Sequence, residues 1–199
     1  MLRLLGRKTS GNVQKVLWML EELEVEYVRE DYGRQFGNTA DDAYLQMNPT
    51  GKVPTLVDGD HIIWESNTIL RYLCLTQNSD LLPGDPASRA QCETWMDWLL
   101  ASLNSHYVNV FKESKKAEED RTEIEAMGRP LSDQLSVLEQ HLGGNEWIGG
   151  DSFSVADIAL GPICKGCLRF PIDLPALANT RRWHELISKR TAYQKVVAA

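Results

Sequence analysis

Three polar side chains stand together near the start of the chain, in the segment Thr9-Ser10-Gly11-Asn12. Hydroxyl and amide groups stabilise an anion where the N-terminus of a helix offers unpaired N–H groups and the positive end of its dipole. The same residue types are also the usual N-caps of helices, so a purely structural cap formed by Ser10 or Thr9 would explain the segment too. The segment therefore predicts either an anion-binding turn or an ordinary helix cap.

The flanking residues predict that this segment joins a strand to a helix. Residues 2–5 alternate apolar residues as a short strand does, and residues 13–23 carry apolar side chains at the spacing of one buried helical stripe. Further along, Asp58-Gly59-Asp60 is typical of a hairpin turn between two strands. We expect the order strand, helix, strand, short helix, two strands and helix within the first 76 residues or so.

The composition changes after this region. Residues 77–87 are rich in proline and glycine, as a linker is, and the later residues have helical patterns, with helices expected over 87–111 and 117–142. The sequence therefore predicts two domains, residues 1–78 and residues 86–199.

The overall composition is that of an ordinary globular protein, with 199 residues, 43% hydrophobic and 25% charged. The net charge of −7 and the lack of a basic run argue against a nucleic-acid partner. No apolar run is long enough for a membrane span, and the N-terminus does not resemble a secretory signal, so we expect no membrane partner and a cytoplasmic location. The scattered cysteines and histidines predict no metal site.

Two local patterns in the second half have mainly structural interpretations. Ser154 and Asp157 have the spacing of a capping box, with Asp in the usual place of Glu, before an apolar helix. Cys164 and Cys167 form a CxxC motif, but it lies within a predicted helix of the second domain, so we expect buried, unreactive thiols.

Four motifs occur in an order and spacing that are typical of one family. They are Ser10-x-Asn12-x-x-Lys15-Val16, Asn48-Pro49-x-Gly51-Lys52-Val53-Pro54, Glu65-Ser66-x-x-Ile69-x-x-Tyr72-Leu73 and Ser154-x-x-Asp157. With these motifs the chain resembles the cytosolic glutathione transferases over essentially its whole length. The resemblance implies an α/β thioredoxin-like N-terminal domain, an all-α helical bundle as the C-terminal domain, and a homodimer with one active site per subunit.

The resemblance also implies where the tripeptide glutathione binds. The family has a cis bond at the position of Val53-Pro54, which would let Val53 pair with the peptide backbone as an added strand does. Glu65 and Ser66, at a helix start, would hold the γ-glutamyl end, with Ser66 on its carboxylate. Candidates for the glycyl carboxylate are Lys52 and, more weakly, Gln35. Taken without the family, a plain helix start would also explain Glu65 and Ser66, and a solvated loop lysine would equally explain Lys52.

Ser10 is the residue that the resemblance assigns to the sulfur. Family branches that use tyrosine or cysteine place it near the first strand, but the first tyrosine here is Tyr27 and no cysteine lies near position 10. That leaves a bacterial, serine-type member, similar to the theta, nu or beta class. Ser10 would donate a hydrogen bond to the glutathione sulfur, and Asn12 would be a secondary donor. Thr9 remains a competitor, because a shift of one residue would exchange the two hydroxyls.

Three functions are compatible with these residues. The first is a glutathione transferase that activates the thiol of glutathione for attack on a small hydrophobic electrophile, with His106 and Tyr107 as possible lining of the acceptor pocket. The second is a glutathione-dependent peroxidase or disulfide reductase at the same site, because the Ser-x-Asn arrangement is similar to a reducing bacterial branch. The third is a non-catalytic ligand-binding or interaction module.

Overall fold

The computed structural model describes residues 1–198, which divide into two units. The first unit contains Met1–Leu82 and also the segment from Arg190 onward, and the second contains Pro83–Lys189. The grouping of the last segment with the first unit was not expected from the sequence. The predicted domain limits, 1–78 and 86–199, stay a prediction.

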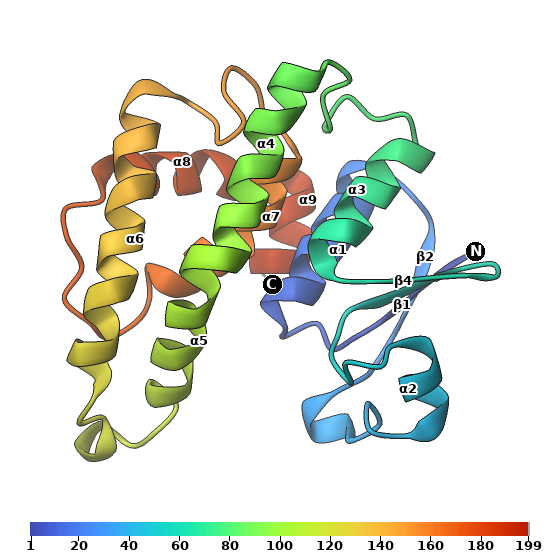
Figure 1. Cartoon of the computed structure of the whole chain (residues 1–199), viewed down its shortest axis with the longest axis horizontal. Coiled ribbons are helices and arrows are strands. Elements are labelled where there is room, and N and C mark those ends of the chain that lie inside the picture. Colours follow the sequence, from blue (N-terminus) through green and yellow to red (C-terminus); the bar gives the residue numbers. More distant parts are fainter. Residues whose placement is uncertain (199) are drawn as a thin grey trace. The chain divides into compact units, whose positions relative to one another are not determined.

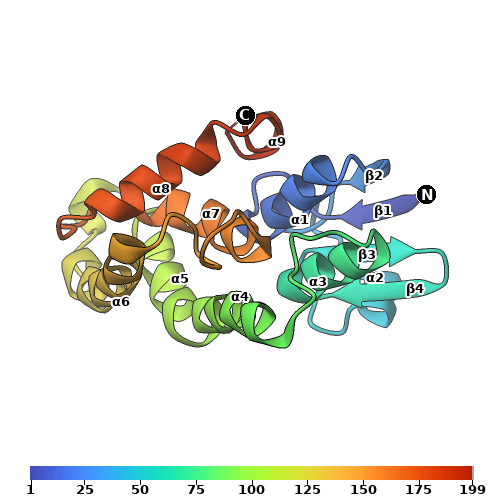
Figure 2. The same ribbon diagram turned by 90° about the horizontal axis from the view of Figure 1, so that it is seen from above.

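The first unit is built on a four-stranded sheet with the order β2-β1-β3-β4. Strand β1 pairs with β2 in parallel and with β3 in antiparallel fashion, and β3 and β4 form the hairpin that Asp58-Gly59-Asp60 predicted (Figure 2). The strands are β1 (Leu2–Leu5), β2 (Tyr27–Glu30), β3 (Thr55–Asp58) and β4 (His61–Trp64).

Helices cover both faces of this sheet. Figure 1 shows α1 (Gly11–Glu22) and α3 (Ser66–Thr76) on one side of the strands and α2 (Asp42–Met47) on the other. The apolar stripe predicted for the first helix is buried over most of its length, as Val13 and Leu20 illustrate, because it packs toward the sheet and α3. A 3₁₀ turn, Arg34–Phe36, precedes α2.

The segment from Arg190 onward belongs to the first unit because it is attached to α1. The Arg190 guanidinium donates to both carboxylate oxygens of Glu22, at 2.6 and 2.7 Å. Tyr193, in the short helix α9 (Thr191–Tyr193), meets the ring of Trp18 edge-on at 4.8 Å between centroids. A bidentate ion pair and an aromatic contact of this geometry are both specific attachments.

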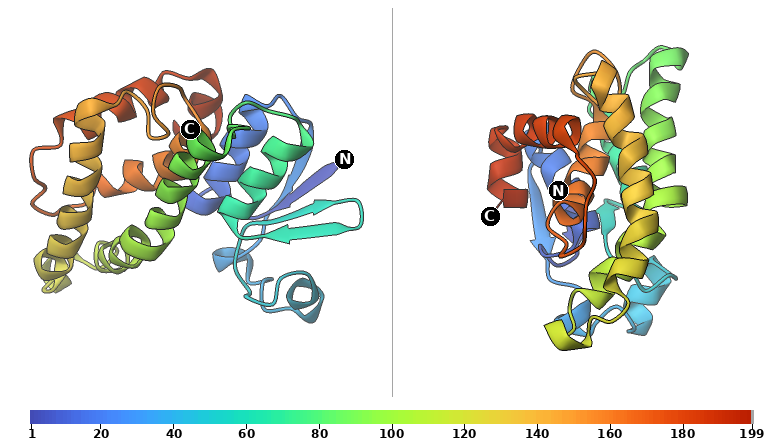
Figure 3. Two further views of the ribbon diagram at one scale, coloured as in Figure 1. Left: turned by 45° about the horizontal axis from the view of Figure 1, so that its top comes forward. Right: turned by 90° about the vertical axis from the view of Figure 1, so that its left-hand side faces the viewer.

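The second unit is all-helical, as predicted. Figure 3 shows its helices, of which α6 packs against both α5 and α8. The helix expected over 117–142 begins only at Ile124, since residues 118–120 form a separate 3₁₀ turn. No helix among residues 1–198 has the length and apolar character needed to cross a membrane. The elements are α4 (Pro86–Trp98), a π-helical turn (Leu99–Leu103), α5 (Asn104–Glu113), α6 (Ile124–Gly144), α7 (Val155–Cys167) and α8 (Ala178–Ser188).

Candidate active site

The turn between β1 and α1 holds Ser10 as the N-cap residue of α1, where the sequence placed it. Its backbone is extended and the residue is 9% exposed, but its side chain makes no capping hydrogen bond. Instead, the Ser10 N–H donates to the carbonyl of Arg7 at 3.2 Å, and the Ser10 carbonyl accepts from the N–H of Gln14 at 2.9 Å. Interpreting Ser10 as an ordinary side-chain cap was therefore wrong, and its hydroxyl makes no hydrogen bond within residues 1–198.

Thr9, the competing hydroxyl, has a different environment. It is exposed and lines a cavity of about 230 Å³ together with side chains of α1, β2 and the C-terminal segment. Gln14, Tyr27 and Lys195 are among the other residues that line this cavity, and Ser10 is not. The two neighbouring hydroxyls thus differ in burial and in surroundings.

The N-terminus of α3 carries Glu65 and Ser66. Glu65 is the N-cap residue with φ +68° and ψ 115°, which is an unfavourable backbone conformation for a residue with a side chain, and its carboxylate makes no capping hydrogen bond. Ser66 is 4% exposed, and its hydroxyl donates to the amide oxygen of Asn12 at 3.4 Å. Asn12 lies in the first turn of α1, so the structure brings the starts of α1 and α3 together.

The segment before β3 presents Val53. The Val53-Pro54 bond is cis, as the family resemblance implied. Within residues 1–198 no hydrogen bond uses the backbone N–H or C=O of Val53. These are the groups that a peptide bound as an added strand would need.

A hydrogen-bond network that the sequence reasoning missed holds this segment in place. The Tyr44 hydroxyl donates to the Lys52 carbonyl at 2.6 Å, and the Asn48 amide donates to the same carbonyl at 2.9 Å. Asn48 also donates to the hydroxyl of Thr55 at 3.0 Å. Tyr44 is 1% exposed and is the buried residue of the short helix α2, and this aromatic residue in a short helix was the available signal in the sequence.

Lys52 and Gln35, the candidates for the glycyl carboxylate, have exposed side chains. Gln35 lies in the 3₁₀ turn between Gly33 and Gly37, whose φ values of +82° and +68° suit glycine. No contact joins Lys52 to Gln35 among the described residues, so their shared role stays a prediction.

The thiols do not form a reactive site. All four cysteines are buried, and burial raises the pKa of the Cys167 thiol well above its ordinary value. This agrees with the expectation for the CxxC motif, since a thiol that stays protonated is a poor nucleophile. Within residues 1–198 no three His, Cys, Asp or Glu side chains gather as a metal ion would require.

Comparison with known proteins decides the family. Residues 2–74 match the family described as glutathione S-transferase, N-terminal domain, and residues 94–190 match its C-terminal domain. Glutathione S-transferase GstB of Escherichia coli strain K12 is 37% identical over 203 residues, which cover 99% of this chain and 98% of GstB. The chain belongs to the glutathione S-transferase family.

Two other relatives of this glutathione S-transferase bear on its chemistry. A crystal structure of the theta class enzyme from Xanthomonas axonopodis pv. citri with glutathione bound has a TM-score of 0.94 and 33% identity, covering 100% of this chain and 97% of that one. The disulfide-bond oxidoreductase YfcG of Escherichia coli strain K12 is 28% identical and covers 92% of this chain and 88% of YfcG. The predicted family and its thioredoxin-like plus helical architecture are confirmed.

The residues suggested for the acceptor pocket lie on α5 of the second unit. Tyr107 borders a cavity of about 400 Å³ whose other lining includes Phe111, Phe170 and Arg121. Its ring stacks on Phe111, with 6.0 Å between centroids. His106 is half-buried and does not line this cavity. The lining of this cavity combines the aromatic rings with the cationic side chains of Lys115, Arg121 and Arg169.

Proposed function

We propose that this glutathione S-transferase binds glutathione in its first unit and holds the sulfur as a thiolate through a hydrogen bond from the Ser10 hydroxyl. The thiolate would then attack a small hydrophobic electrophile. One observation carries the proposal: a nearly buried serine hydroxyl at the N-terminus of α1 makes no hydrogen bond within residues 1–198. The glutathione seen in the Xanthomonas relative supports the choice of ligand.

The energies are adequate for this role. A free thiol has a pKa of about 8.5, so only a few per cent is thiolate at neutral pH. Lowering that pKa by about two units requires roughly 2.7 kcal/mol of preferential stabilisation of the anion. A hydrogen bond to a charged group contributes about 1.5–3 kcal/mol, and a helix N-terminus adds up to about 1–2 kcal/mol. Ser10 and the first N–H groups of α1 together reach the required amount.

The rest of the tripeptide would lie along the groups already described. The N–H and C=O of Val53 would pair with its backbone, and Ser66 at the start of α3 would bind the γ-glutamyl carboxylate. Glu65 would meet the amino group at the same end. Lys52 and Gln35 would attract the glycyl carboxylate. Asn12, in contact with Ser66, would connect the sulfur end to the γ-glutamyl end.

The serine-type assignment is tested by removing one hydroxyl at a time. Ser10→Ala should raise the pKa of bound glutathione's thiol by about one to two units and leave glutathione affinity nearly unchanged. Thr9→Ala is the matched control, because Thr9 is exposed and adjacent. The measurement is the ultraviolet absorbance of the thiolate as a function of pH, with affinity from calorimetry. An unchanged titration in Ser10→Ala, or a shift in Thr9→Ala instead, would remove Ser10 from this role.

A second candidate is reduction of a peroxide or disulfide by glutathione at the same site. Its support is the 28% identity to YfcG, which is named a disulfide-bond oxidoreductase. Activity of the purified protein toward an aromatic halide, compared with a hydroperoxide and a disulfide, would distinguish the two. Binding of glutathione without either activity would favour the non-catalytic module.

Assembly as a homodimer and a cytoplasmic location are also part of the proposal. The homodimer rests on the family resemblance, and the cytoplasmic location rests on the expectation from the sequence. Sedimentation of the purified chain and fractionation of the source cells would test them separately.

A further inference from the structure

The Arg7 side chain has no hydrogen-bond or ion-pair partner within residues 1–198, whereas the arginines of the neighbouring strands are paired with carboxylates. On β1, Arg3 donates to Glu30 at 2.6 and 3.1 Å, and on β2, Arg29 pairs with Asp31. Within residues 1–198 the Arg7 side chain makes no hydrogen bond or ion pair, and its Nε atom is fully buried. A buried donor without an acceptor is unfavourable, and for a guanidinium the penalty is larger.

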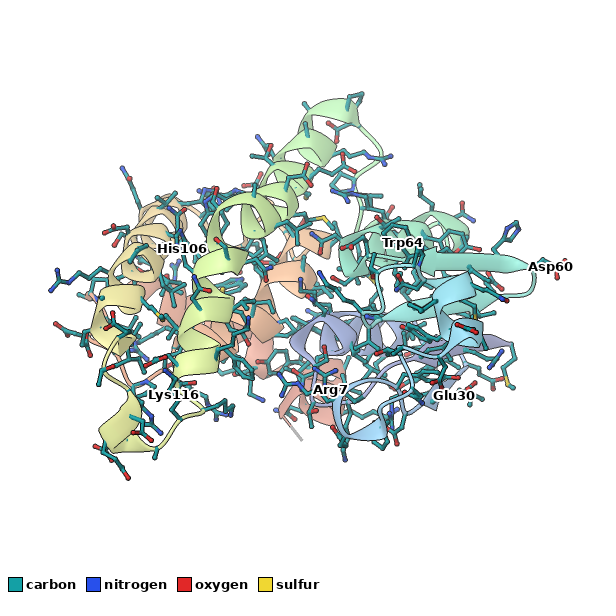
Figure 4. The ribbon with its side chains drawn as sticks, turned by 60° about the horizontal axis from the view of Figure 1, so that its bottom comes forward. Arg7, Glu30, Asp60, Trp64, His106 and Lys116 are labelled. Atoms are coloured by element: carbon teal, nitrogen blue, oxygen red, sulfur yellow. The ribbon has the colours of Figure 1, made fainter. Side chains whose placement is uncertain are left out.

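The guanidinium of Arg7 lies at the candidate site. A Cβ atom built on Gly33 would be 3.1 Å from Arg7 Nη1 and 3.5 Å from Val53 Cγ1, so the two side chains border the same small space. The Arg7 carbonyl accepts the N–H of Ser10 at 3.2 Å, which places Arg7 in the same turn as the proposed sulfur donor. Figure 4 shows Arg7 close to the loop that follows β2.

The local electrostatics also favour an anion. Burial lowers the pKa of the Arg7 guanidinium below its ordinary value, and the positive charge of Arg34 lowers it further. The two nearby carboxylates of β2 and its end, Glu30 and Asp31, are already held by Arg3 and Arg29. Arg7 is partly exposed, and no carboxylate of residues 1–198 pairs with it, so its guanidinium is accessible to the carboxylate of a ligand.

We propose that Arg7 is a specificity-determining residue that binds the carboxylate of a small anionic electrophile, and this inference rests on the proposed glutathione transferase function. A guanidinium matches a carboxylate with two parallel N–H donors. The two carboxylates of glutathione have other candidate partners at Ser66 and at Lys52 with Gln35. The carboxylate bound by Arg7 is therefore that of the molecule that the sulfur attacks.

Iodoacetate and iodoacetamide form a matched pair of probes, because they differ in charge and hardly in size. In both reactions the glutathione thiolate forms a sulfur–carbon bond at the CH₂ group, the carbon–iodine bond breaks, and iodide leaves with its electron pair. The thiol proton goes to solvent. The quantity measured is kcat/KM divided by the uncatalysed rate constant for each probe. The ratio of these two values, iodoacetate over iodoacetamide, reports recognition of the carboxylate.

We expect this ratio to exceed one in the wild type and to fall about tenfold or more in Arg7→Gln. Arg7→Lys should recover part of it, because the charge remains but the two parallel donors do not. Arg3→Gln is the control, since it removes an arginine of the neighbouring strand β1 that is paired with Glu30. Thermal unfolding of each variant confirms folding.

Three outcomes would overturn the inference. The wild-type ratio could be one or less, or Arg7→Gln could lower both probes equally. Alternatively, the loss in Arg7→Gln could appear as weaker glutathione binding by calorimetry, in which case Arg7 serves the glycyl carboxylate. Turnover of iodoacetamide by the wild type tests the proposed function independently, and if neither probe is turned over and glutathione does not bind, both proposals fail.

Discussion

Two helix starts of the first unit differ from two helix starts of the second. In the second unit, Asp157 and Ser154 close the start of α7, and the carboxylate of Glu139 on α6 accepts N–H groups at the start of α8. In the first unit, α1 and α3 begin at Ser10 and Glu65, and neither side chain forms a cap. A helix start that the protein leaves uncapped keeps its positive potential available for a ligand, whereas a capped start contributes stability.

Asp157→Ala should have the largest effect on stability, because Asp157 accepts several buried hydrogen bonds at the start of α7. The buried carboxylate accepts from the N–H of Ile148 at 2.9 Å and from the Trp183 indole at 2.7 Å, in addition to its bonds with Ser154. Loss of this acceptor leaves buried donors unpaired, so we expect a decrease of about 3 kcal/mol or more in the free energy of unfolding. Urea unfolding followed by circular dichroism measures it. Asp151→Ala, at an exposed site, is the control, and equal stability of the two variants would contradict the prediction.

Replacing the serine at the capped start of α7 should affect stability, whereas replacing the serine at the uncapped start of α1 should affect the bound glutathione. Ser154→Ala removes an acceptor for the Ala156 N–H and should lower stability by about 1 kcal/mol without affecting glutathione. Ser10→Ala removes no capping bond and should change stability by less than about 0.5 kcal/mol. Denaturant unfolding and glutathione calorimetry on both variants test this. A large destabilisation by Ser10→Ala would show that its hydroxyl is structural after all.

The cap of α8 should make stability depend on pH. Burial alone raises the Glu139 pKa, but the N–H and side-chain donors of Asn179 and Thr180 outweigh it, so the pKa is lowered. A carboxylate with a lowered pKa in the folded state stabilises the fold above its unfolded pKa of about 4.3, and this contribution is lost as the pH falls through the folded pKa. Glu139→Gln should lower the free energy of unfolding by about 1 kcal/mol at neutral pH. It should also make the free energy of unfolding fall less steeply as the pH becomes acidic.

The measurement is urea unfolding at a series of pH values from neutral to acidic. Glu119→Gln, at an exposed position, is the control and should leave the profile unchanged. If the free energy of unfolding fell as steeply with acidic pH in Glu139→Gln as in the wild type, the cap of α8 would not be the cause of this pH dependence.

The smallest expected effect concerns the strained backbone at the start of α3. Glu65 has φ +68°, and Glu24, just after α1, has φ +52°. Glycine accepts these values, so Glu65→Gly and Glu24→Gly should each raise stability by about 0.5 kcal/mol after the entropic penalty of glycine. Only Glu65→Gly should weaken glutathione binding by calorimetry. If both variants bound glutathione equally well, the backbone conformation and side chain of Glu65 would have no role in glutathione binding.

Short-range features of the fold and site were predictable because they depend on spacing. The capping box of Ser154 and Asp157 joins residues three apart, and the position of Ser10 at the start of α1 follows from the strand and helix patterns beside it. The start of α6 was misplaced because a 3₁₀ turn has nearly the same local pattern as a helix.

The sequence by itself determined the family, the order of the elements, the location of the turns and the residue types offered at each helix start. Only the tertiary structure decided which of those groups are used by the protein. The Ser66 hydroxyl meets Asn12 across 54 positions, Glu139 caps α8 across about 40, and Arg7 lies beside Gly33 without an acceptor. Hydrogen bonds within one turn of helix follow from residue spacing, but contacts between distant residues depend on how the elements pack.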